Sequence, residues 1–150
     1  MKKLLLALFA ISCGAALFAA PAPRGSTTPE GWYDDFAAAQ KEAVKTGRPM
    51  LVLLTGSDWC GFCVRLKKTV LDTDGFKQFA AEKLILVYLD FPSHRVKLPA
   101  ELTKQNAALE ERFRVGGYPT TVILSPDGKE LGRIVGAARN YLERVKKLVR

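Results

Sequence analysis

The alternation of apolar and polar positions divides the chain into short strands and amphipathic helices. An unbroken apolar run over residues 50–54 predicts a strand that is buried on both faces. The segment before it, residues 34–46, repeats apolar residues at helical spacing and ends at Gly47, which is typical of a helix C-terminus. The apolar face of this predicted helix consists of Phe36, Ala39, Ala43 and Val44.

The rest of the chain continues to alternate between helix and strand. Ser-Pro-Asp-Gly at residues 125–128 is a strong hairpin signal between two apolar segments. Two of the predicted strands are parallel and joined by a helix, which indicates an α/β domain. The predicted elements are helices over residues 60–71, 99–113 and from about 140, a short helical segment after residues 72–74, and strands over residues 84–89, 121–124 and 130–135.

The first twenty residues have the pattern of an export signal. Two lysines precede an uncharged apolar run over residues 4–20, and small residues and prolines follow it, as in a secretory signal peptide. We expect a signal peptide over residues 1–20, a flexible segment over residues 21–31, one folded domain over residues 32–150, and a periplasmic or secreted protein. Two alternatives stay open: the leader is kept as a membrane anchor, or Cys13 is a lipidated cysteine.

Composition fits a single globular domain. A chain of 150 residues that is 48% hydrophobic and 25% charged is close to the globular average, which excludes disordered, collagen-like and coiled-coil classes. The formal net charge of +8 would favour an anionic partner if the basic residues were clustered. The basic residues of the last predicted helix surround an apolar stripe, which indicates a solvated face. We therefore expect no nucleic-acid partner, and we expect a monomer.

The cysteines indicate redox chemistry. With Cys13 in the leader, Cys60 and Cys63 form a C-x-x-C pair in a chain that is exported to a compartment where disulfides persist. Structural zinc needs four Cys or His ligands, whereas the chain has one histidine, and attached haem needs a histidine where Val64 stands. A two-residue loop makes a weak structural staple. A redox dithiol remains, and we expect no metal and no cofactor.

The position of the pair favours a reactive thiolate. Residues 55–58 are turn-like and the helical pattern begins at Cys60, so Cys60 is predicted to lie at a helix N-terminus. The helix dipole there lowers a thiol pKa from about 8.5 towards 7. We expect Cys60 to attack a disulfide, and Cys63, one turn further in and more buried, to resolve the mixed disulfide.

The sequence from Trp59 to Cys63, W-C-G-F-C, resembles the active site of the thioredoxin superfamily, in which W-C-x-x-C begins a helix after a central strand. Residues 116–120, GGYPT, resemble the cis-proline loop of the same family. The resemblance covers nearly all of residues 32–150, with the family's often variable first strand in doubt. It implies a thioredoxin-like fold, a central mixed β-sheet flanked by helices, with the active-site C-x-x-C at a helix N-terminus. It also implies a cis Tyr118–Pro119 bond beside the cysteines, and substrate contacts from Trp59, Gly61, Phe62, Tyr118 and Pro119.

Two positions depart from the family pattern. The buried aspartate that lies six residues before the first cysteine of cytosolic thioredoxins is Leu54 here, and the lysine that commonly accompanies it is Tyr88. Without a buried charge nearby, the Cys63 thiol should stay protonated to higher pH. Resolution then depends on Asp58, water or the partner protein. Asp58 also fits an ordinary solvated turn residue.

The dipeptide between the cysteines bears on the direction of electron flow. Strong oxidants of the family often carry a histidine there, whereas Gly61-Phe62 is neutral. The chain resembles small exported thioredoxin-like proteins, which implies a thiol-disulfide oxidoreductase, most simply a reductase of disulfide-containing protein substrates with a membrane electron-transfer partner. An isomerase or oxidase is the alternative, and a non-enzymatic adaptor on the same fold is a second class. A peroxidase is not favoured, because no peroxide-activating motif is present.

Overall fold

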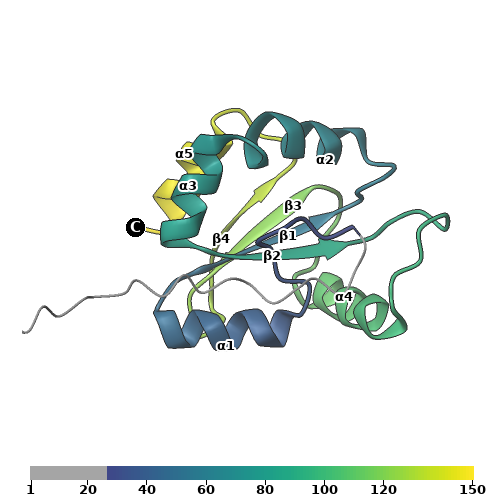
Figure 1. The fold of residues 1–150 in the computed structure, drawn as a ribbon, viewed down its shortest axis with the longest axis horizontal. Coiled ribbons are helices and arrows are strands. Elements are labelled where there is room, and N and C mark those ends of the chain that lie inside the picture. Colours follow the sequence, from purple (N-terminus) through teal and green to yellow (C-terminus); the bar gives the residue numbers. More distant parts are fainter. Residues whose placement is uncertain (1–26) are drawn as a thin grey trace, which may run out of the picture.

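A fully buried strand runs through the middle of the structure. The structure, a computed structural model, describes residues 27–150. Strand β1 (Met50–Thr55) is buried at all six positions, because it pairs with a strand on each side and has helices on both faces (Figure 1). The unbroken apolar run therefore predicted this strand correctly.

Four strands form one mixed sheet in the order β2-β1-β3-β4. Strand β2 (Ile85–Asp90) is parallel to β1, whereas β3 (Thr120–Leu124) is antiparallel to β1 and β4 (Glu130–Val135) is antiparallel to β3. The parallel register pairs Thr55 with Asp90 at the carboxyl ends of β1 and β2. The loops that leave these two strands therefore start side by side.

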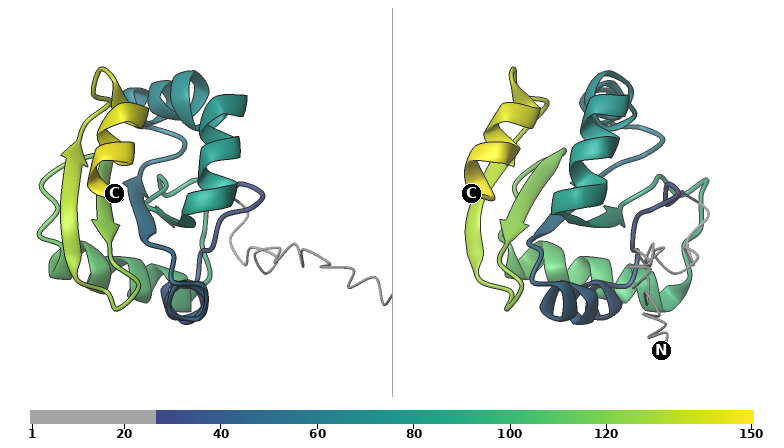
Figure 2. Two further views of the ribbon diagram at one scale, coloured as in Figure 1. Left: turned by 90° about the vertical axis from the view of Figure 1, so that its left-hand side faces the viewer. Right: turned by 60° about the vertical axis from the view of Figure 1, so that its left-hand side comes forward.

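Helices cover both faces of the sheet. Helices α1 and α4 lie on one face, and α2, η1, α3 and α5 lie on the other (Figures 1 and 2). Each layer encloses its own cluster of buried apolar residues. The bounds are α1 (Phe36–Thr46), α2 (Gly61–Leu66), η1 (Lys67–Leu71), α3 (Asp74–Lys83), α4 (Ala100–Arg112) and α5 (Tyr141–Leu148).

Local sequence signals explain where several helices begin and end. Asp35 caps α1 by accepting a hydrogen bond from the Ala38 backbone N–H at 3.0 Å. The same helix ends at Gly47, whose φ of 68° is in the left-handed region that glycine adopts without strain. Thr73 caps α3 through the Phe76 N–H. These ends agree with the sequence predictions.

One prediction on α1 is wrong. Phe36, Ala39 and Ala43 are buried as expected, but Val44 is 63% exposed. Val44 follows Ala43 by about 100° around the helix axis, which takes it off the buried stripe and onto the solvent side. Apolar character at a neighbouring position was not enough to place Val44 in the core.

The predicted helix over residues 60–71 is divided in two. After α2 the chain widens into the π-helical turn η1, in which the Asp72 N–H donates to the Lys67 carbonyl at 2.9 Å. The Thr69 hydroxyl donates to the Arg65 carbonyl at 2.9 Å, which competes with the regular helical bond. Hydrophobic spacing does not reveal this local change of period.

Within residues 27–150, an isolated bridge stands where the family pattern has its first strand. Tyr33 pairs with Val87 beside β2. Its N–H donates to Leu86 and its carbonyl accepts from Tyr88, both at 2.8 Å.

No helix within residues 27–150 combines the length and the apolar character needed to cross a bilayer. The predicted signal peptide, Cys13 and most of the segment over residues 21–31 lie outside the described residues.

A buried hydrogen bond joins α5 to the sheet and provides a test of the packing. The hydroxyls of Tyr141 and Thr121 are 2.6 Å apart, and both residues are buried. Tyr141→Phe leaves the Thr121 hydroxyl without this partner, so the free energy of unfolding in urea should fall by about 1–2 kcal/mol. Adding Thr121→Val removes the orphaned hydroxyl and should recover part of that loss. An unchanged stability in the single variant would contradict this role for the bond.

Candidate active site

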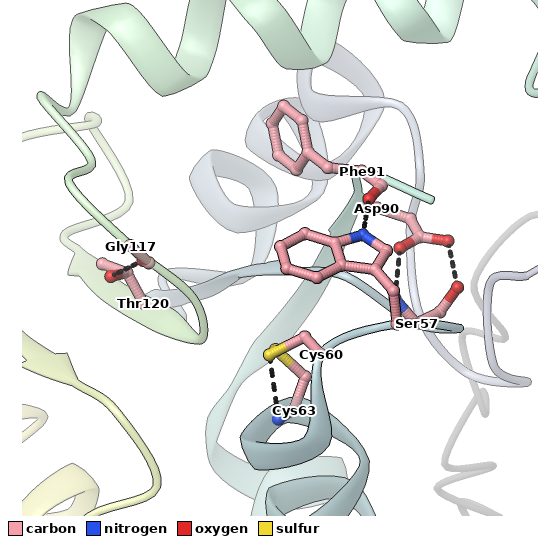
Figure 3. The surroundings of a disulfide bond; sticks show 8 residues. Ser57, Cys60, Cys63, Asp90, Phe91, Gly117 and Thr120 are labelled. Atoms are coloured by element: carbon pink, nitrogen blue, oxygen red, sulfur yellow. Dashed lines mark hydrogen bonds between the residues drawn. A yellow bond between two sulfur atoms is a disulfide. The ribbon is translucent and has the colours of Figure 1, made fainter. Parts of the chain in front are cut away.

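Cys60 caps the helix that follows the central strand. Its backbone is extended (φ −86°, ψ 100°), and its Sγ accepts a hydrogen bond from the Cys63 N–H at 3.2 Å. The two cysteines form a disulfide with a Cα–Cα distance of 5.2 Å (Figure 3). Cys60 therefore occupies the helix N-terminus that the sequence predicted.

This position suits nucleophilic attack by the reduced form. The first N–H groups of a helix are not used by its regular i to i−4 bonds. The Cys63 N–H is shared between the Cys60 carbonyl at 2.9 Å and the Cys60 sulfur at 3.2 Å. Together with the helix dipole, this arrangement favours a thiolate on Cys60. The two residues are 6% and 4% exposed, so the expected greater burial of Cys63 is slight.

Hydrogen bonds fix the loop that leads into Cys60. The Ser57 N–H donates to Asp90 Oδ1 at 2.9 Å and the Ser57 hydroxyl donates to Asp90 Oδ2 at 2.6 Å (Figure 3). The Trp59 indole N–H donates to the Phe91 carbonyl at 2.7 Å. Because Asp90 is buried at the end of β2, the loop is attached to a rigid part of the sheet.

Asp58 is part of the same attachment. Its two carboxylate oxygens accept hydrogen bonds from the N–H and the hydroxyl of Ser93. The Ser93 hydroxyl bond, followed by its backbone bond, lowers the pKa of Asp58 below its ordinary value. Asp58 is exposed in the turn before Cys60, which agrees with its interpretation as a solvated turn residue. Its bonds to Ser93 also hold the segment after β2 in place.

Trp59 lies over a glycine and remains open to solvent. A Cβ at Gly56 would come within 2.5 Å of the indole ring, closer than such atoms approach in proteins. The indole is nevertheless 55% exposed, and Phe62 between the cysteines is 67% exposed. Gly61 is the first residue of α2 and is exposed. These residues leave apolar surface next to the disulfide.

The loop with the second family motif, residues 116–120 (GGYPT), also lies near the disulfide (Figure 3). The Tyr118–Pro119 peptide bond is cis, as the family pattern implied. The Pro119 carbonyl accepts from the Gly136 N–H at 2.7 Å, and the Thr120 hydroxyl donates to the Gly117 carbonyl at 2.7 Å. Figure 3 shows residues 117 and 120 on the side of the disulfide opposite Asp90. The Trp59 and Tyr118 rings meet edge to face, with centroids 5.7 Å apart.

The two departures from the family pattern both lie in the core. Leu54 is fully buried in β1, so no carboxylate occupies that position. Tyr88 is buried in β2, and burial, followed by the charge of Asp90, raises the pKa of its hydroxyl above the ordinary value. Tyr88 therefore stays neutral at physiological pH and supplies no charge.

Residues 27–150 contain no group of three or more His, Cys, Asp or Glu side chains placed to hold a metal ion.

Sequence reasoning missed the side chains that support the site. Asp90 holds Ser57, and Asn106 of α4 donates to the Asp90 carbonyl at 2.9 Å. Glu110, one turn later on α4, accepts from the Tyr118 hydroxyl. An aspartate at the end of a parallel strand beside the active-site strand was a usable signal for Asp90. The bonds of Asn106 and Glu110 join distant segments and leave no local pattern.

The central mixed sheet, the flanking helices and the disulfide at the start of α2 define a thiol-disulfide oxidoreductase with a thioredoxin fold. The family described as a thioredoxin-like domain matches residues 36–148. The chain belongs to this thioredoxin-like domain family.

Similar proteins agree with this assignment. The chain is 31% identical over 117 residues to the disulfide bond reductase DsbH of Chlamydia pneumoniae, covering 76% of this chain and 70% of DsbH. It is 30% identical over 103 residues to the thioredoxin-related protein DsbJ of the same organism, covering 69% of this chain and 29% of DsbJ.

Solved structures give the same result. A DsbH oxidoreductase superposes with a TM-score of 0.72 at 25% identity, covering 99% of this chain and 94% of the other. A thioredoxin from Thermus thermophilus gives a TM-score of 0.59 at 26% identity, covering 78% and 82% of the two chains. The predicted fold and the predicted thiol-disulfide exchange chemistry are confirmed.

The attachment of the active-site loop to Asp90 can be tested directly. Asp90→Ala leaves the Ser57 N–H and hydroxyl without their acceptor, so the free energy of unfolding should fall by about 2–3 kcal/mol. The looser loop should also slow the alkylation of reduced Cys60 by iodoacetamide. Asp90→Asn keeps an acceptor oxygen and should show smaller effects of both kinds. Wild-type stability and alkylation rate in Asp90→Ala would show that the bonds from Ser57 to Asp90 do not hold the loop.

Proposed function

We propose that this protein is an exported reductase of disulfide bonds in other proteins. The Cys60 thiolate attacks one sulfur of a substrate disulfide, and the other substrate sulfur leaves as a thiolate and takes up a proton. Cys63 then loses its proton and attacks the Cys60 sulfur, which closes the Cys60–Cys63 disulfide and releases the second substrate thiol. Two electrons and two protons pass from the protein to the substrate.

The observation that carries this proposal is the disulfide at the start of α2. Its Cys60 sulfur accepts a hydrogen bond from the Cys63 N–H. The same contact that caps the helix in the oxidised form would stabilise a Cys60 thiolate in the reduced form. An adaptor has no chemical need for this arrangement.

The reducing direction rests on two further points. The residues between the cysteines, Gly61 and Phe62, are neutral, and a cation that would stabilise the reduced form of a strong oxidant is not among them. The relative DsbH carries the name disulfide bond reductase. An isomerase or an oxidase remains the alternative for this site.

The surroundings of the disulfide suit a polypeptide substrate. Trp59, Phe62 and Val64 are exposed apolar side chains at the start of α2, and an extended chain bearing a disulfide can lie across them. We assign substrate contact to Trp59, Gly61, Phe62, Tyr118 and Pro119. Aromatic side chains at such a surface bury much area at little entropic cost.

Export would place the reaction in an oxidising compartment. We assign residues 1–20 to a signal peptide, residues 21–31 to a flexible segment and residues 32–150 to the catalytic domain. Retention of the leader as an anchor, or lipidation of Cys13, would keep the protein at a membrane. A reductase outside the cytosol needs electrons from within, so we propose a membrane electron-transfer protein as its second partner and a monomer as the working form.

The exchange mechanism predicts a trapped intermediate. Cys63→Ser removes the resolving thiol, so reduced protein mixed with a disulfide-bonded peptide should accumulate a one-to-one adduct at Cys60, detected by mass spectrometry. Turnover with dithiothreitol should fall at least about a hundredfold, because resolution loses its intramolecular nucleophile. Cys60→Ser is the matched control and should form no such adduct. Failure of Cys63→Ser to form one, with Cys60 reduced, would overturn the mechanism.

A further inference from the structure

Tyr118 is held between two other aromatic rings at the active site. Its ring meets Trp59 edge to face, with centroids 5.7 Å apart and planes at 87°. On another side it packs against Phe91, with centroids 5.2 Å apart and planes at 34°. Trp59 is itself attached to Phe91 by the 2.7 Å hydrogen bond from its indole. The orientation of the Tyr118 ring therefore affects the exposed Trp59 surface.

The far end of Tyr118 is attached to a helix on the other side of the sheet from α2. The Tyr118 hydroxyl donates to Glu110 Oε1 on α4. Both side chains are partly buried, so the bond is shielded in part from water. Burial, and then the bond to Glu110, raise the pKa of Tyr118 above its ordinary value. The hydroxyl therefore stays protonated and able to donate.

Helix α4 supports both parts of the site from one face. Asn106 and Glu110 are one helical turn apart, so their side chains leave the same side of α4. Asn106 donates to the carbonyl of Asp90, which holds the loop before Cys60. Glu110 holds Tyr118, which precedes the cis proline. Asn106 and Glu110 bind Asp90 and Tyr118 and not the cysteines. Any effect of these two side chains on substrate therefore acts through the residues that they hold.

Different disulfides would depend on this support to different extents. A small aromatic disulfide needs only access to the Cys60 sulfur. A polypeptide also lays the residues that flank its cysteine across the surface of Trp59 and Tyr118. Loss of the Tyr118 orientation would therefore weaken the binding of a polypeptide more than the intrinsic reactivity of Cys60.

We propose that Glu110 is a positioning residue that sets the orientation of Tyr118 for polypeptide substrates and so favours protein disulfides over small ones. This inference rests on the proposed reductase function. Glu110 acts through its hydrogen bond to Tyr118 and not by contact with substrate or with the cysteines.

The test compares two substrates with the purified protein. The protein substrate is insulin, with dithiothreitol as electron donor. The small substrate is 5,5′-dithiobis(2-nitrobenzoate), mixed in a single turnover with pre-reduced protein from which dithiothreitol has been removed, because dithiothreitol reduces this disulfide directly. Glu110→Ala should raise KM for insulin about tenfold, with kcat changed less than about twofold, because a partly buried hydrogen bond to a charged group is lost. The rate with the small disulfide should not change.

Two matched variants separate positioning from general damage. Glu110→Gln keeps an acceptor oxygen for the Tyr118 hydroxyl and should restore KM for insulin to within about twofold of wild type. Glu111→Ala changes the exposed neighbour on the same helix and should behave as wild type. Alanine is a good helix former at both positions, so α4 should remain intact.

The experiment distinguishes failure of the positioning role, of the hydrogen bond and of the reductase function. An unchanged KM for insulin in Glu110→Ala, or equal losses with both substrates, would overturn the positioning role while leaving the reductase function standing. Equal damage in Glu110→Gln and Glu110→Ala would overturn the role of the hydrogen bond. A wild-type protein that reduces neither substrate would overturn the proposed function and this inference with it.

Discussion

The active site depends on the bond between a buried carboxylate and the loop that precedes the cysteines. Asp90 ends β2 beside the carboxyl end of β1, and it accepts both the N–H and the hydroxyl of Ser57. That contact fixes Ser57 within the segment from Thr55 to Cys60, so the sulfur lies at the first turn of α2 in a defined orientation. The parallel pairing of β1 and β2 creates this arrangement, because it brings two carboxyl ends to one edge.

The two helical layers contribute differently to the chemistry. Helix α2 provides the cysteines and the N-terminal amides that favour a thiolate on Cys60. Helix α4 lies on the other face of the sheet (Figure 1) and provides two polar side chains that support the site. Asn106 holds Asp90, which binds the loop before Cys60, and Glu110 holds the ring of Tyr118. The core between the layers is apolar, with Leu54 where cytosolic thioredoxins carry a carboxylate. Proton transfer to and from Cys63 therefore takes place without a charged residue at that position.

The sequence was sufficient for the parts of the structure that local physics determines. An unbroken apolar run revealed β1, and the change to helical spacing after it placed Cys60 at a helix N-terminus. Val44 was misplaced because apolar character alone does not fix its angle around α1. The roles of Asn106 and Glu110 could not be predicted, since their partners lie 16 and 8 positions away and become neighbours only after folding. Residue types predicted the chemistry, whereas long-range contacts determine how that chemistry is supported.

A Cys60–Cys63 pair that donates electrons to substrate disulfides must have a low equilibrium reduction potential, and this potential is the measurement that decides between a reductase and its alternatives. Purified protein would be equilibrated in dithiothreitol and glutathione buffers of known potential, and the free thiols of the pair quantified after acid quenching. We expect a value near the reducing end of the family's range, about −270 mV. A value between about −180 and −120 mV, typical of isomerases and oxidases, would contradict it.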